Sequence, residues 1–140
     1  MQKVLSKKAQ AALEYMTTIG FALLILLGLT AFAYNYTLTA RQSGNVATAS
    51  ATVNNIVESA NLVYAQGYPA KATIIVQIPE NVESVTFSNK AIIMKLKVKG
   101  GITDIAAVSK AQLQGGMPQT QGFYKISVQS FGDYVNVTRA

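Results

Sequence analysis

The sequence predicts an α+β protein in which a long N-terminal helix packs on a small antiparallel β-sheet domain. Three observations support this fold class: an uncharged apolar run near the N-terminus, an alanine-rich stripe with helical spacing after it, and alternating β-branched residues beyond Pro69. We therefore expect the helix to end at residue 66 and the β-domain to cover residues 70–140.

The apolar run is long enough to cross a bilayer. Residues 19–34 hold no charged side chain, and with residues 15–18 they give about 20 residues, or roughly 30 Å of helix, which matches a hydrocarbon core. Lys3, Lys7 and Lys8 crowd the N-terminal flank, whereas Arg41 is the only basic residue shortly after the run. The positive-inside rule then places the bulk of the protein outside the membrane.

The residues that lead into this run carry a motif. Lys8-Ala9 is followed by Gln10-Ala11-Ala12-Leu13-Glu14-Tyr15 and then by the apolar helix. This string resembles the N-terminus of archaeal type IV pilins with a class III signal peptide, although Ala12 stands where serine is common. The resemblance implies a leader of residues 1–9 cleaved between Ala9 and Gln10 by a prepilin peptidase, and a mature helix over residues 10–66. It also implies assembly contacts through Glu14, Tyr15, Gly20 and Phe21.

The function implied by this resemblance is structural. A pilin is a subunit of a helical homo-oligomeric filament used for adhesion or surface attachment. Its precursor is held in the cytoplasmic membrane before the pilus assembly machinery transfers it to an extracellular filament. Two alternatives stay open at this point: a single-pass membrane-anchored extracellular binding domain, and a minor pilin that does not itself form the filament body.

A different interpretation of the same stretch is an ordinary secretory signal. The basic flank, the apolar run and the small-x-small triplet Ala31-Phe32-Ala33 have the order of such a signal. A mature N-terminus at Tyr34 would favour that interpretation, and one at Gln10 would favour the pilin.

Glu14 is the one acidic residue beside the apolar run. A carboxylate costs about 2.5–3.5 kcal/mol at the centre of a membrane helix and less near its end, so Glu14 lies at the headgroup level in water or has a partner. The resemblance implies the N-terminal amine of a neighbouring subunit as that partner. Because N-terminal glutamine can cyclise and lose its amine, the hydroxyls of Thr17 or Thr18 from an adjacent helix are the alternative.

Beyond the membrane the helix continues as an amphipathic half and is followed by strands. Its stripe is Val46, Ala49, Val53, Ile56, Ala60 and Val63, and Gly67 and Pro69 end it. We expect the stripe to form the core together with the apolar faces of the sheet. The predicted strands cover residues 72–78, 82–87, 91–99, 102–108, 123–130 and 134–138, with a hairpin turn at 131–133 and a loop over 109–122.

Composition excludes several classes of function. The 140 residues include no cysteine and no histidine, so the chain lacks disulfides and the usual transition-metal ligands, and we expect no metal and no cofactor. Its acidic residues Glu80, Glu83, Asp104 and Asp133 show no paired spacing, which indicates that the protein is not an enzyme. The formal charge is +6, and loss of the three leader lysines halves it.

Two further sets of residues are candidate sites. Lys95, Lys97 and Lys99 fall on one face of the predicted strand 91–99, as either a polyanion contact or an edge-protecting, solvated face. The solvated face is the more common use of such a row, so we expect no nucleic-acid partner. The triplets beginning at Asn35 and Asn136 match the N-glycosylation sequon, with Asn136 the better candidate because its predicted strand position is exposed.

Overall fold

A computed structural model describes residues 2–140 and confirms the predicted fold class. One helix, α1 (Gln2–Gln66), includes the expected leader from Gln2 onward, whereas Met1 lies outside the described residues. The helix ends where the sequence predicts. Gly67 adopts the left-handed φ of 77°, and its amide donates to the carbonyls of Val63 at 3.1 Å and Tyr64 at 3.2 Å. This arrangement closes the last turn, as a glycine cap does.

The chain divides into two compact units. The N-terminal unit ends at Ala40 and is helical, and the C-terminal unit is Arg41–Ala140. All seven strands belong to the C-terminal unit, where they follow the last turns of α1.

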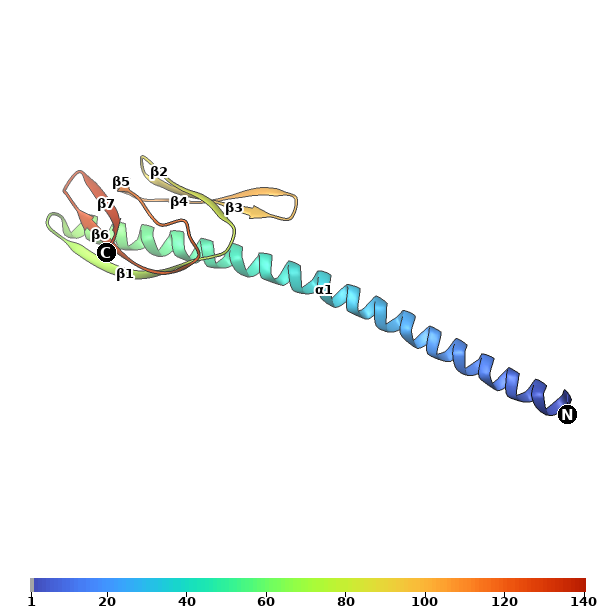
Figure 1. The fold of residues 1–140 in the computed structure, drawn as a ribbon. Helices are drawn as coiled ribbons and strands as arrows, with labels where there is room; N and C mark the ends of the chain where they lie inside the picture. The colour runs from blue at the N-terminus through green and yellow to red at the C-terminus, as the bar shows by residue number, and fades with distance from the viewer. Residues whose placement is uncertain (1) are drawn as a thin grey trace. The chain divides into compact units, whose positions relative to one another are not determined.

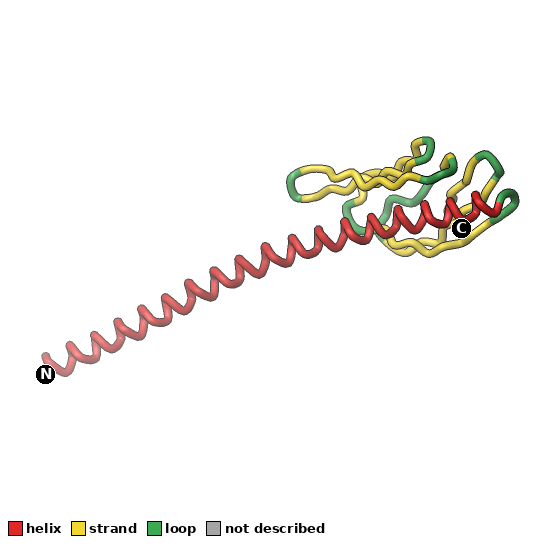
Figure 2. Tube along the Cα trace, turned by 180° about the vertical axis from the view of Figure 1, so that it is seen from behind, coloured by secondary structure: helices red, strands yellow, loops and turns green. Residues whose placement is uncertain are grey.

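The strands form two sheets, and Figure 1 shows both beside the α1 turns that belong to the C-terminal unit. The four-stranded sheet has the order β1-β6-β7-β5 and contains β1 (Lys71–Ile78), β6 (Gly122–Ser130), β7 (Tyr134–Arg139) and β5 (Gln112–Gly115). The three-stranded sheet has the order β2-β3-β4 and contains β2 (Val82–Ser88), β3 (Ala91–Val98) and β4 (Gly101–Val108). The turns and loops between them are drawn in green in Figure 2.

The expected stripe of α1 forms the centre of the core. Val53, Ile56 and Ala60 are fully buried, and Val57 and Val63 are nearly so. They pack with the inward side chains of both sheets, which are Val76 of β1, Ile92, Met94 and Leu96 of β3, Leu113 of β5, Ile126 and Val128 of β6, and Val135 and Val137 of β7. A single helix face therefore supplies the apolar surface that each small sheet lacks by itself.

Polar contacts also tie α1 to the strands. The hydroxyl of Thr52 donates to the Gln77 carbonyl of edge strand β1 at 2.5 Å. The Asn61 side-chain oxygen accepts from the Ser109 hydroxyl at 2.9 Å and from the Lys110 amide at 2.8 Å. Every buried side-chain nitrogen or oxygen in the described part of the chain has a hydrogen-bond partner.

The sequence-based expectation differs from the structure in two respects. The expected single antiparallel sheet is two sheets, and the expected loop 109–122 contains strand β5, which pairs in parallel with β7. Leu113 of β5 is buried while its neighbours Gln112 and Gln114 are exposed, so the strand has the alternation of a half-buried strand. Its four residues are too short for that alternation to stand out in the sequence.

Candidate assembly helix and surface sites

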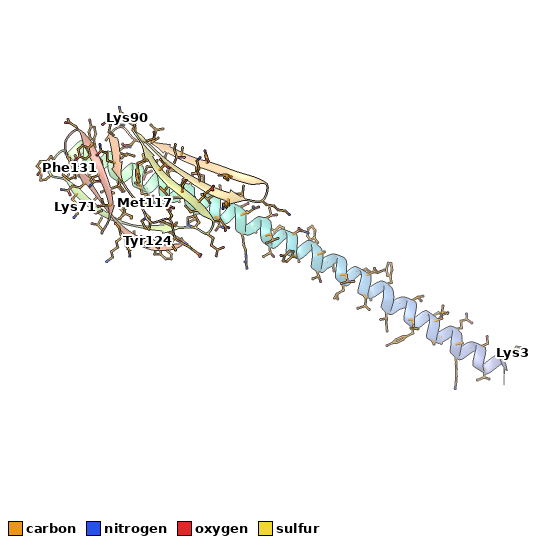
Figure 3. All side chains as sticks on the ribbon, turned by 45° about the horizontal axis from the view of Figure 1, so that its top comes forward. Lys3, Lys71, Lys90, Met117, Tyr124 and Phe131 are labelled. Atoms are coloured by element: carbon orange, nitrogen blue, oxygen red, sulfur yellow. The ribbon has the colours of Figure 1, made fainter. Side chains whose placement is uncertain are left out.

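The N-terminal unit presents an apolar surface that is exposed over the residues that the structure describes. The exposed fractions of Phe21, Leu24, Leu27 and Phe32 are 67%, 68%, 65% and 70%, and Figure 3 shows the side chains of this part of α1 pointing outward all around the helix. In length and composition this is the one helix among residues 2–140 that is suited to crossing a membrane, and no part of its most apolar 18-residue window is buried. Such a helix near the N-terminus fits a membrane anchor or a signal sequence.

The threonine and asparagine side chains in this part of the helix form hydrogen bonds with the helix itself. The hydroxyls of Thr30, Thr37 and Thr39 each donate to the carbonyl four residues earlier, at 2.8–3.0 Å. The Asn35 amide does the same to Ala31 at 3.1 Å. An unpaired donor in an apolar environment costs several kcal/mol, and these bonds remove that cost. The surface of the helix is therefore compatible with lipid or with other apolar helices despite its threonines.

The expected assembly residues lie on this surface. Tyr15 and Phe21 are exposed, Gly20 is half-buried by its own helix, and a Cβ added at Gly20 would meet no atom within 4 Å. The peptide bond expected to be cleaved, between Ala9 and Gln10, lies inside α1, and both of these residues are exposed.

Glu14 is exposed on the same surface, and the two threonines proposed as its partner already use their hydroxyl protons. Thr17 donates to the main-chain carbonyls of Leu13 and Glu14, both at 2.9 Å, and Thr18 donates to that of Glu14 at 2.8 Å. An adjacent copy with the same geometry offers no free hydroxyl proton at these positions. A carboxylate enclosed among such helices therefore needs a donor other than threonine.

The lysine row on β3 is not a uniform cationic stripe. Lys95 is half-buried, and the register places it between Ser84 of β2 and Asp104 of β4. An opposite charge directly across a strand pair offsets the lysine. Lys97 is exposed and faces Ile102, and Lys99 is exposed in the turn after β3. The three lysines share a face as expected, but only the last two stand without a cross-strand acid.

The two sequons lie in different surroundings. Asn35 is in the middle of α1 with its amide nitrogen bonded to its own helix. Asn136 lies on β7 and is half-buried between Gln129 of β6 and Gln114 of β5, which is less open than the exposed position that alternation predicts. Thr138, the third residue of that sequon, is exposed.

Two hollows flank α1 at the start of the C-terminal unit. One, of about 430 Å³, is lined by Arg41, Gly44, Asn45, Thr48, Gln77, Pro79, Glu80 and Gln121. In it the Gln121 amide donates to the Glu80 carboxylate at 3.1 Å. The other, of about 590 Å³, is lined by Gln42, Ser43, Val46, Ala47, Ser50, Val98 and Lys99. Neither combines a nucleophile with a base in the way that catalysis requires.

Acidic side chains do not gather into a cation site within residues 2–140, where no group of three potential ligands was found. The chain's most distinctive chemical feature is the exposed apolar N-terminal half of α1 with its one carboxylate, Glu14. Comparison of the sequence with family models and with curated proteins, and of the fold with solved structures, found no match.

Proposed function

We propose that this protein is a pilin-like structural subunit of an extracellular filament, assembled through the N-terminal half of α1. The observation that carries the proposal is the exposed apolar surface of that half, whose threonine and asparagine side chains are bonded within the helix. Leaving such a surface in water is unfavourable, because roughly 25 cal/mol is lost for each Å² of apolar area that stays hydrated.

Two environments relieve this exposure in turn. A bilayer accepts the helix while the protein is a precursor, because about 20 residues span the hydrocarbon. On release from lipid, copies of the same helix provide an equivalent apolar environment, and enclosure by them is worth tens of kcal/mol before the cost of ordering is subtracted. Contacts between unlike faces of identical subunits give an open helical filament when the rotation between subunits does not close a ring, and this is the product that we propose.

The C-terminal unit supports the same assignment. Its core is complete within the chain, so the apolar N-terminal half is not needed to fold it. The N-terminal half is thereby available for association with lipid or with other copies. Resemblance of the Gln10–Tyr15 string to archaeal pilins adds the expected cleavage after Ala9, and Glu14 becomes the fifth residue of the mature chain.

The direct test is the identity of filaments sheared from cells that produce the protein. Mass spectrometry should identify this chain as a main component with an N-terminal peptide that begins at Gln10. A mature product that begins at Tyr34, or that stays dispersed as single soluble molecules, would contradict the proposal. A membrane-resident chain that never enters filaments would support the anchored binding domain instead.

A variant series then tests the role of the carboxylate. We expect Glu14→Gln to reduce filament yield by at least tenfold, because the neutral amide no longer attracts a cationic donor from the neighbouring helix. Glu58→Gln is the matched control, since Glu58 is an exposed carboxylate on the same helix outside the apolar half. Normal filaments from Glu14→Gln would show that the charge is dispensable.

A further inference from the structure

The turn between β3 and β4 combines exposed cationic and apolar side chains. Lys97 and Lys99 are exposed, and Ile102, which pairs with Lys97 across the hairpin, is 54% exposed. Gly100 has a φ of 108°, which lets the chain reverse within two residues. An isoleucine flanked by two lysines is the combination that favours a lipid–water interface, where the apolar tip enters and the ammonium groups stay among the headgroups.

This turn lies beside the part of α1 with which the C-terminal unit begins. Val98 and Lys99 line a hollow together with Gln42 and Ser43, so the turn lies beside the first residues of the C-terminal unit. In Figure 1 the β3–β4 turn lies at the end of the three-stranded sheet that is remote from the last turn of α1. Arg41 follows Tyr34, the last residue of the apolar run, by seven residues. A fully extended chain of that length covers at most about 25 Å.

Charges at this end of the unit divide into two groups. Arg41 and Glu80 line the same hollow on one side of α1, where the Glu80 carboxylate accepts a hydrogen bond from the Gln121 amide. Lys95 is offset by Asp104 across the β3–β4 pair. Lys97 and Lys99 remain, and the hollow that Lys99 lines includes no acidic residue. Glu83, on the neighbouring strand β2, lies at the bulge opposite Leu96 and Lys95 rather than at the turn.

We propose that residues 97–102 are a membrane-contact element that binds anionic lipid headgroups on the leaflet from which α1 emerges. Ile102 enters the interface, and the ammonium groups of Lys97 and Lys99 bind lipid phosphates. This inference rests on the membrane-spanning state of the proposed precursor and does not depend on filament formation. It predicts that the subunit is held at the bilayer by its outer domain as well as by α1, and that extraction into a filament must break this contact.

The test uses the full chain in nanodiscs of phosphatidylcholine alone or with one third phosphatidylglycerol. Hydrogen exchange of the amides at 98–102 should slow by about tenfold or more in the anionic discs, since each lysine near an anionic surface contributes about fivefold. High salt should abolish most of the effect. Lys97→Gln with Lys99→Gln should remove the lipid dependence, and Ile102→Ser should weaken protection in both lipids.

The matched control is Lys90→Gln with Lys110→Gln, which removes two exposed lysines at the other end of the unit. Lys90 lies there in Figure 3, and the Lys110 amide is bonded to Asn61 of α1. These side chains should have no effect on exchange at 98–102.

Three results would overturn the inference. Exchange at 98–102 could be the same in both lipids, or the control pair could act as strongly as Lys97 and Lys99. The Lys97 and Lys99 variant could also lose binding to duplex DNA while keeping lipid protection, which would assign the lysines to a soluble polyanion. A chain that inserts normally but shows no protection rejects only this inference. A chain that does not enter the discs at all rejects the membrane-spanning precursor as well.

Discussion

The hydrogen bond from Thr52 to β1 offers a sharp test of how the helix holds the sheet. Thr52 is 3% exposed, and its hydroxyl donates to the Gln77 carbonyl, 25 residues away in sequence. Thr52→Val keeps the shape of the side chain and removes the donor. The carbonyl then faces α1 without a partner, which we expect to lower the free energy of unfolding of the C-terminal unit by about 1–2 kcal/mol.

This value corresponds to a measurable shift in melting temperature. For a unit of this size, 1 kcal/mol moves Tm by about 4–8 °C, so Thr52→Val should lower Tm by roughly 5–15 °C. Thr52→Ser keeps the hydroxyl and loses one methyl group, worth about 0.8 kcal/mol. The serine variant should therefore be less affected than the valine variant, although it removes more apolar surface.

Thr48→Val is the control for replacing a threonine in the same helix. Its hydroxyl donates at 2.9 Å to Gly44 within α1, so its loss leaves no strand carbonyl unpaired. We expect a change within about 0.5 kcal/mol.

The assay follows unfolding of the full chain in detergent micelles by near-ultraviolet circular dichroism. The chain has seven tyrosines and no tryptophan, and Tyr64, Tyr68, Tyr124 and Tyr134 belong to the C-terminal unit. Equal Tm values for Thr52→Val and the unmodified chain, or a larger loss with serine than with valine, would refute the assigned hydrogen bond.

Two further predictions concern the four-stranded sheet and the sequons. Gly115→Ala should separate β5 from β7, because the added Cβ would lie 1.9 Å from the Val137 carbonyl oxygen and the φ of +125° disfavours a side chain. A Cβ added at Gly116 meets no atom within 4 Å, so Gly116→Ala is the control and should leave the hydrogen-exchange protection of β7 intact. If the filaments are glycosylated, Asn136→Gln should remove the added mass and Asn35→Gln should not, since the Asn35 amide is bonded within α1. The measurement is the intact mass of the subunit from purified filaments. Loss of the added mass in Asn35→Gln alone would contradict this prediction.

The structure weakens two of the expectations drawn from the sequence, the threonine partners of Glu14 and the polyanion site on β3. The hydroxyls of Thr17 and Thr18 are bonded to their own helix, so they no longer compete well as partners of Glu14. The lysine row on β3 is broken by the acid opposite Lys95, so a polyanion site over all three lysines loses support. In both cases the sequence shows which residues are present. It does not show that the threonine hydroxyls are bonded to main-chain carbonyls or that Asp104 lies opposite Lys95.

The sequence by itself determined the features that depend on neighbours along the chain. The apolar run, the stripe that includes Val53 and Ile56, and the glycine cap at Gly67 are set by local periodicity and backbone preference, and all three were predicted from the printed residues. The inward positions of β3, with Ile92, Met94 and Leu96, followed from simple alternation.

Only the tertiary structure decided how these elements are partnered. The division into two sheets, the parallel pairing of β5 with β7, and the bond from Thr52 to Gln77 join residues far apart in sequence. Strand pairing is selected by the total burial achieved around α1, because each small sheet lacks a core of its own and each edge must find a neighbour. The pairing of strands therefore cannot be inferred from a local pattern. The helix boundaries and the faces of the strands can, because they depend on residues that are neighbours along the chain.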